Sequence, residues 1–217
     1  MCRYPIQRMK IGLLSDIHSE LNGLELALAQ LQRQKVDQII CIGDVVEIGR
    51  GLGDEVVARL KELAIPCVMG NHDQYSVGHH LWLLKKGDSA DQSRLLQPET
   101  FTYLQHLPET LHYEWARQRV VISHGTIWTL HPQTRPYIFK RIVELADADI
   151  LILGHTHIPM RAHIEGRWVL NPGSVSDRGS RTCAILTLPE LCFSVYDIVT
   201  GKPIQEAFIE YPHIEAE

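Results

Sequence analysis

Residues that commonly bind metal ions follow five short apolar runs in this sequence. Asp16 and His18 follow the first run, and His155 and His157 follow the last. Both pairs have a spacing of two, so in an extended chain the two side chains point to one face. Taken alone, the Asp-His pair is more simply a turn with a satisfied histidine, and the His-His pair is as readily two surface histidines.

Three further groups follow the runs in between. Asp44 comes after a glycine at the end of the second run, where a plain turn is the commoner arrangement. Asn71 begins the group Asn-His-Asp, and asparagine is a poor choice after a buried strand unless its carbonyl oxygen binds a ligand or caps a helix. His124 lies in Ser-His-Gly, which by itself decides nothing.

The groups mean more together than apart. The candidate ligands are two Asp, one Asn and four His at the ends of predicted strands: Asp16, His18, Asp44, Asn71, His124, His155 and His157. Nitrogen and oxygen ligands without thiolate are typical of sites for borderline divalent metals. This set exceeds the needs of one tetrahedral ion but suffices for two ions that share a bridging carboxylate. Such pairs, about 3.5–4 Å apart, stabilise the attacking and leaving oxygens of a phosphoryl transfer.

Alternating strands and helices are expected to position these groups. Short apolar runs bounded by turn residues predict buried strands at 11–14, 39–42, 66–69, 120–122 and 150–153. Apolar residues three or four apart predict helices over 21–31, 54–63 and 138–145. Strand–helix–strand order implies parallel pairing with right-handed crossovers, and ligands gather at the carboxyl ends of strands in such sheets.

The remaining segments have weaker patterns. The runs 168–170, 183–188 and 193–199 are separated by turns too short for helices, which predicts a β-meander at the C-terminal end. Segment 74–98 is expected to be partly helical at best. Because the sequence has no compositional break, repeat or linker, we expect a single domain over residues 1–217.

Length, composition and charge exclude several classes of protein. The chain has 217 residues, 45% hydrophobic and 22% charged, which is ordinary for a globular protein and not for a disordered or coiled-coil one. No apolar run approaches the roughly 18 residues of a membrane span, and none near the N-terminus suits a signal peptide. The net charge of −5 argues against a stable nucleic-acid complex and a membrane partner. We expect a cytoplasmic protein whose five cysteines are reduced.

The ordered motifs resemble those of the calcineurin-like metallophosphoesterase superfamily. They are DxH at 16–18, GDxxE at 43–47, GNHD at 70–73, SHG at 123–125 and GHTH at 154–157, followed by Asn-Pro-Gly-Ser at 171–174. The likeness runs from Ile11 to about Thr200, and it is greatest to the small single-domain bacterial and archaeal phosphodiesterases. It implies an α/β (α+β) fold, a four-layer α/β/β/α sandwich of two mixed sheets flanked by helices.

The resemblance implies a role for each matched ligand. The first metal ion would be held by Asp16, His18 and His157. The second would be held by Asn71, His124 and His155. Asp44 would bridge the two ions. Mn²⁺ is expected first, ahead of Fe²⁺, Zn²⁺, Ni²⁺ and Mg²⁺.

Three further residues would be catalytic. His72 would stay unligated beside the site, placed to protonate a leaving oxygen or to hold a phosphate oxygen. Glu47, three positions after the bridging carboxylate, would orient His72. Asp73 is the competing candidate for that task, although a turn cap is its simpler interpretation.

The activity implied is hydrolysis of small phosphodiesters, cyclic nucleotides included, by in-line attack of a hydroxide that bridges two divalent ions. The expected partner is therefore a small phosphorylated substrate, and whether the chain forms a homo-oligomer stays open. A phosphomonoesterase acting on phosphoprotein or dinucleotide polyphosphate ranks second, because Ile48 stands where those phosphatases have arginine and Asp73 stands where they have Glu. Phosphate could also be contacted by Arg50, Arg135, Arg178 and Arg181, although each is more simply a solvated charge.

A different class of function is a non-catalytic scaffold. The retromer scaffolding subunit has this fold but lacks the histidine of the GNHD motif. His72 and all the candidate ligands are present in this chain, which favours an enzyme.

Overall fold

The computed structural model describes residues 8–47, 53–87 and 91–211. Ile48 and Arg50 lie outside these ranges. The helices are α1 (Leu21–Arg33), α2 (Asp54–Glu62), α3 (Asn71–Lys86), the short 3-10 helix η2 (Gln92–Arg94), α4 (Pro98–Gln105) and α5 (Pro136–Ala146). The strands are β1 (Met9–Leu14), β2 (Gln38–Cys41), β3 (Thr110–Trp115), β4 (Gln118–Ser123), β5 (Ile150–Ile152), β6 (Met160–Ile164), β7 (Arg167–Asn171), β8 (Thr182–Leu188), β9 (Cys192–Asp197), β10 (Pro203–Ile204) and β11 (Ala207–Tyr211).

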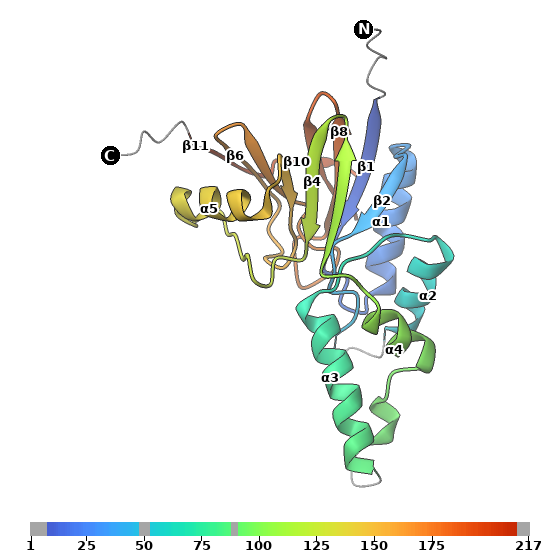
Figure 1. The fold of residues 1–217 in the computed structure, drawn as a ribbon. Helices are drawn as coiled ribbons and strands as arrows, with labels where there is room; N and C mark the ends of the chain where they lie inside the picture. Colours follow the sequence, from blue (N-terminus) through green and yellow to red (C-terminus); the bar gives the residue numbers. More distant parts are fainter. Residues whose placement is uncertain (1–7, 48–52, 88–90, 212–217) are drawn as a thin grey trace, which may run out of the picture.

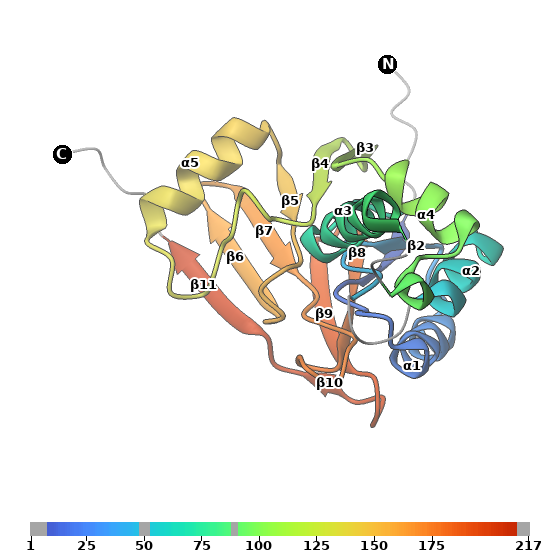
Figure 2. The same ribbon diagram turned by 90° about the horizontal axis from the view of Figure 1, so that it is seen from below.

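The strands form two mixed sheets. One sheet has the order β10-β9-β8-β1-β2, with β1 and β2 parallel and β1 and β8 antiparallel. The other has the order β11-β6-β7-β5-β4-β3, with β4, β5 and β7 parallel. The sheets lie face to face, α1 and α2 cover the outer face of the first, and α5 covers the outer face of the second (Figures 1 and 2). The predicted four-layer sandwich is confirmed.

Alternate side chains of a strand point to opposite faces of the sheet. Both faces of each sheet are buried, so both are apolar. On β8, Ala184 and Leu186 pack between the sheets, whereas Cys183 and Ile185 pack under the helices. This explains why the strands are read as continuous apolar runs rather than alternating ones.

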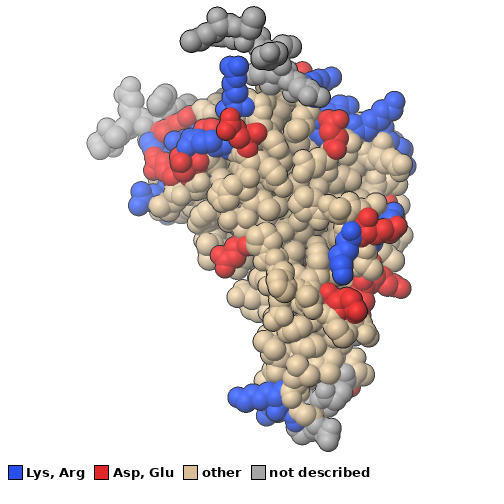
Figure 3. Space-filling model, turned by 45° about the vertical axis from the view of Figure 1, so that its right-hand side comes forward, with Lys and Arg blue, Asp and Glu red and all other residues tan. Residues whose placement is uncertain are grey.

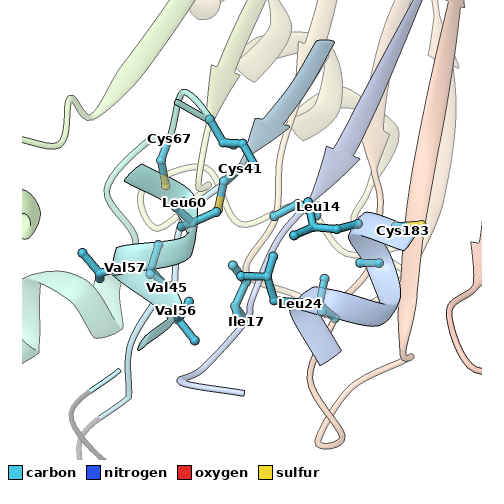
Figure 4. Close-up of a cluster of buried hydrophobic side chains, with 14 of the residues drawn as sticks. Leu14, Ile17, Leu24, Cys41, Val45, Val56, Val57, Leu60, Cys67 and Cys183 are labelled. Carbon is cyan, nitrogen blue, oxygen red and sulfur yellow. The ribbon is translucent and has the colours of Figure 1, made fainter. Parts of the chain in front are cut away.

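Helices α1, α2 and α5 bury the apolar residues that recur every three or four positions along them. Leu24 of α1 and Leu60 of α2 are fully buried against the first sheet, in a cluster that includes Leu14 and Cys41 of neighbouring strands (Figure 4). Phe139 of α5 is likewise fully buried against the second sheet. Burial of a side chain of this size contributes roughly 1.5–3 kcal/mol. The three predicted helices are confirmed.

The prediction of a C-terminal β-meander was wrong in part. The strand β7 does not form a meander with β8 and β9, because it pairs with β5 and β6 in the other sheet. Segment 74–98 is partly helical, as expected, because it contains η2 and most of the sixteen-residue helix α3. This helix projects with α4 from one end of the sandwich, and Lys and Arg side chains gather at the tip of the resulting arm (Figures 1 and 3).

The predicted strand at 66–69 is reduced to a single bridge, in which Cys67 pairs with Cys41. Among the described residues, the cysteines at 41, 67, 183 and 192 are free thiols. None of the helices in the described ranges has both the length and the apolar character that crossing a membrane requires.

Candidate metal centre

The loops that carry the candidate ligands lie at the carboxyl ends of the central strands, next to the start of α3 (Figure 1). The loop after β1 is held to the loop after β2 by main-chain bonds, among them those from the N–H groups of Ile17 and His18 to the carbonyl of Asp44. The loops after β4 and β5 approach from the second sheet, where the N–H of Gly154 donates to the carbonyl of His124 at 3.1 Å. Side chains far apart in the sequence therefore share one site.

Asp16, His18 and His157 form a first group. Their ligand atoms lie within 4.8 Å of one another. His157 Nε2 is 3.2 Å from Asp16 Oδ1 and 3.1 Å from His18 Nε2. Asp16 and His18 are buried, whereas the His157 side chain is 28% exposed, so solvent reaches the group on that side.

Asp44, His124 and His155 form a second group, again with ligand atoms within 4.8 Å. Asn71 joins it, because its Oδ1 lies 3.1 Å from His124 Nε2. Asp44 Oδ2 is 3.2 Å from that nitrogen and 3.9 Å from Nε2 of His18 in the first group. The Asp44 carboxylate thus lies between the two groups.

Carboxylate, amide and imidazole groups that can act as acceptors converge here. His124 Nδ1 donates to the carbonyl of Ile42 at 2.7 Å, so Nε2 faces the oxygens of Asp44 and Asn71 and can donate to them only when the ring is protonated. Asp16 Oδ1 is buried and has no hydrogen-bond partner among the described residues. Converging lone pairs repel one another, and a bound cation relieves that cost. These residues therefore fit divalent metal ions with nitrogen and oxygen ligands.

The pKa values of these side chains also indicate that the site favours a bound positive charge. Burial opposes protonation of His124, but Asp44 and Asp16 outweigh it and raise the His124 pKa to about 9. Burial lowers the pKa of His18 and of His155, which favours the neutral form that binds metals. Burial also opposes ionisation of Asp44, yet its hydrogen bond with His124 holds the Asp44 pKa below the usual value.

Most of the ligands sit on strained backbone. Asp16, His18, Asp44, His155 and His157 have φ between 52° and 67°, the left-handed region that residues other than glycine seldom adopt. Such strain costs of order 1–3 kcal/mol per residue and clusters at functional sites. It turns the side chains out of the strand direction and toward one another.

Only glycine fits at position 70, because the main chain there approaches Asp44 closely. A Cβ at Gly70 would collide with the carboxylate and main-chain nitrogen of Asp44. Glycine at this position lets the bridging candidate lie directly against the start of α3.

His72 and Glu47 lie together beside the first group. The ligand atoms of His18, Glu47 and His72 are within 4.8 Å of one another, and Glu47 Oε2 is 3.7 Å from His18 Nδ1. The His72 ring meets the His18 ring edge-on, with 4.8 Å between centroids. Arg178 donates to the other Glu47 oxygen at 2.5 Å. This arginine, expected as a surface charge, fixes the Glu47 carboxylate.

Asp73 has different partners. Its Oδ1 accepts the N–H groups of Val45 and Val46 at 2.9 and 3.0 Å, and its Oδ2 accepts that of Gly70 at 2.9 Å. Burial and then the charge of Asp44 raise the Asp73 pKa to about 7, while the bonds from Gly70 and Val46 oppose the shift. Both oxygens thus cap main-chain groups, as in the simpler interpretation of this residue.

Sequence reasoning assigned no role to two positioning residues. Asn171 donates to the carbonyl of Gly154 and to Thr156 Oγ1, at 2.7 and 3.1 Å, and so holds the loop that carries His155 and His157. Ser174 donates to the carbonyl of Asp16 at 3.0 Å. Their place in the Asn-Pro-Gly-Ser motif was the available signal.

Comparison with known proteins agrees with this geometry. The family pattern described as "Calcineurin-like phosphoesterase superfamily domain" matches residues 9–190. The chain belongs to this superfamily. It is therefore a metal-dependent phosphoesterase.

Three relatives give the extent of the likeness. Phosphodiesterase YfcE of Escherichia coli is 29% identical over 177 residues, which are 77% of this chain and 80% of that protein. An uncharacterised protein of Methanocaldococcus jannaschii is 29% identical over 171 residues, 76% of this chain and 69% of that protein. The crystal structure of a metallophosphoesterase from Sphaerobacter thermophilus superposes with a TM-score of 0.66 at 23% identity, covering 92% of this chain and 89% of that one.

Proposed function

We propose that this phosphoesterase hydrolyses small phosphodiesters with two divalent metal ions, Mn²⁺ first among them. The proposed ligands of one ion are Asp16, His18 and His157. Those of the other are Asn71, His124 and His155. Asp44 serves both. The observation that carries the proposal is the convergence of buried carboxylate and imidazole groups around Asp44, beside an Asp16 Oδ1 that has no hydrogen-bond partner among the described residues.

Hydrolysis joins a water oxygen to phosphorus and breaks one ester P–O bond, and a proton from the water ends on the leaving alcohol. Bound divalent ions supply positive charge for the anionic ester and lower the pKa of water. His72 is half-buried at the start of α3, edge-on to His18, so its ring can donate a proton to the leaving oxygen or hold a phosphate oxygen.

Glu47 is proposed to position His72, because its carboxylate lies within reach of that ring and is itself fixed by Arg178. Asp73 is not proposed for this task, since its oxygens accept three main-chain N–H groups. It holds the Asp44 loop to the first turn of α3 instead.

Two features support a phosphodiester rather than a phosphomonoester as the substrate. The relative YfcE is named a phosphodiesterase. A diester carries one negative charge fewer than a monoester dianion, and the charge of Arg178 beside the site is already partly neutralised by Glu47. The cytoplasmic location, the single domain and any homo-oligomer stay predictions.

The test compares p-nitrophenyl phosphate with bis(p-nitrophenyl) phosphate after treatment with a chelator and after addition of Mn²⁺, Zn²⁺, Ni²⁺ or Mg²⁺. We expect chelation to abolish turnover, Mn²⁺ to restore it, and kcat/KM to be higher for the diester. Dominant monoester cleavage would assign the chain to the phosphatases. A folded protein without turnover on either ester, whatever metal is added, would favour the scaffold.

A further inference from the structure

A hollow of about 250 Å³ opens beside the second group of ligands. Its walls come from segments 69–70 before α3, Gln74 in the first turn of α3, 109–110 at the start of β3, and 123–128 after β4. His124 belongs both to this lining and to the proposed metal centre. The hollow therefore adjoins the site on the side of the second group, whereas the pair of Glu47 and Arg178 lies beside the first.

The lining combines large apolar side chains with hydrogen-bonding ones. Trp128 packs partly against the buried cluster under α5 and lines the hollow as well, so packing fixes its indole. Ile127 beside it is 79% exposed and adds apolar surface to the lining. Gln74, Glu109 and Thr110 provide hydrogen-bonding groups.

The charge of the hollow restricts what it can bind. Within the described ranges, the lining residues include no Lys or Arg, and their single carboxylate is that of Glu109. A second phosphate placed here would meet negative charge without a matching cation, which is unfavourable. A neutral group that donates hydrogen bonds would meet the acceptors of Glu109 and Gln74.

We propose that this hollow binds the ester group that stays on the phosphate, and that this group is a nucleoside. The proposal rests on the proposed function and adds its substrate class. The base lies against Trp128, and the sugar hydroxyl or base amino groups donate to Glu109 and Gln74. The departing ester oxygen faces His72, beside the first group, so the remaining ester group faces the hollow. The volume is below the 300–1,000 Å³ typical of pockets for drug-sized ligands, so it suits one nucleoside and not a longer chain.

The test keeps the leaving group constant and changes the group that stays. Thymidine 5′-(p-nitrophenyl phosphate) and methyl p-nitrophenyl phosphate both release p-nitrophenolate, so their chemistry is matched. Because stacking on an aromatic side chain contributes substantially to base binding, we expect kcat/KM to be at least about tenfold higher for the nucleoside ester. Equal values for the two esters would overturn the proposal.

Trp128→Ala is expected to reduce the nucleoside preference about tenfold and to leave the methyl ester unchanged. Trp128→Leu keeps apolar packing and removes the aromatic face, so it should give the same result if the alanine variant fails to fold. Trp82→Ala is the matched control, since Trp82 is 50% exposed on the arm. Glu109→Gln should lower the preference a few-fold, and Glu114→Gln on β3 should not. A parallel loss on both esters in both Trp128 variants would overturn the proposal.

A binding measurement separates this proposal from the proposed function. Calorimetric titration with thymidine 5′-phosphate should show binding that Trp128→Leu weakens about tenfold and Trp82→Ala leaves unchanged. If the methyl ester is not hydrolysed with any metal but this binding pattern is found, the proposed hydrolysis fails and the nucleoside site stands. If the methyl ester is hydrolysed and Trp128→Leu leaves nucleotide binding unchanged, the proposed function stands and the nucleoside site fails.

Discussion

The main-chain N–H of His72 donates to Oδ1 of Asp44 at 2.8 Å. The other Asp44 oxygen points to His124 at 3.2 Å. A single carboxylate therefore ties the start of α3, which carries His72, to the place between the two ligand groups. The position of the proposed proton donor and the position of the shared ligand depend on the same residue.

Asp44→Asn is expected to lose both metal ions and nearly all activity. The amide retains one oxygen for the His72 N–H but removes the negative charge between the two groups, and it puts an NH₂ where Asp44 Oδ2 faces both of them. Metal content after dialysis, measured by mass spectrometry on protein whose circular dichroism is unchanged, checks this. The exposed Asp91→Asn is the control and should keep both ions. Two ions retained in Asp44→Asn would remove its bridging role.

His72→Ala is expected to keep both metal ions and to lower kcat roughly 10²–10⁴-fold, because loss of a general acid has an effect of that size. His79→Ala, on the same helix, is the matched control and should turn over normally. Metal content and kcat should be measured on the same preparations. Unchanged turnover in His72→Ala would take this residue out of the mechanism.

Asp73→Asn is expected to reduce the free energy of unfolding by about 1–3 kcal/mol, because a buried main-chain N–H left without an acceptor costs about that much. Its carboxylate accepts three main-chain N–H groups, and an amide NH₂ would face at least one of them. Urea unfolding of the variant and of Asp91→Asn provides the comparison. Unchanged stability with metals bound and turnover lost would instead make Asp73 the residue that orients His72.

The buried environment of His80 predicts that stability depends on pH through a group outside the metal centre. Its Nδ1 accepts the N–H of Leu96 at 3.1 Å, its ring stacks on Phe101, and burial lowers its pKa. Because the folded state favours the neutral ring, the unfolded chain takes up the proton first as the pH falls below about 6.5. The contribution of His80 to stability is therefore present above that pH and is lost on acidification.

The measurement for His80 is urea unfolding at about pH 7.5 and about pH 5.5. His80→Asn keeps an acceptor for the Leu96 N–H and should show a smaller loss of stability on acidification than the parent protein. His79→Asn should retain the full loss. An equal loss in His80→Asn and the parent would show that this histidine does not contribute to the pH dependence.

Local periodicity explains which elements could be predicted. The apolar stripes of α1 and α5 involve only residues close together in the sequence, and so do the apolar runs of β1 and β4. These elements could therefore be predicted. The extent of helix α3 was not predicted, because this helix projects from the sandwich and exposes apolar residues such as Tyr75 and Trp82. It therefore lacks the one-sided stripe that reveals a helix packed on a sheet.

Non-local pairing explains the other differences. The runs at 168–170 and 183–188 look alike, and only the register with β5 assigns the first of them to the second sheet. The ion pair of Glu47 and Arg178 joins residues 131 positions apart. The spacing of the ligand pairs could be read directly, but the left-handed backbone that turns their side chains together could not.

The most direct test of two ions sharing Asp44 is anomalous diffraction from crystals of the protein grown with Mn²⁺. We predict two peaks about 3.5–4 Å apart, one against Asp16, His18 and His157 and the other against Asn71, His124 and His155, with the Asp44 carboxylate touching both. A single peak, or two peaks of which only one touches Asp44, would contradict this account.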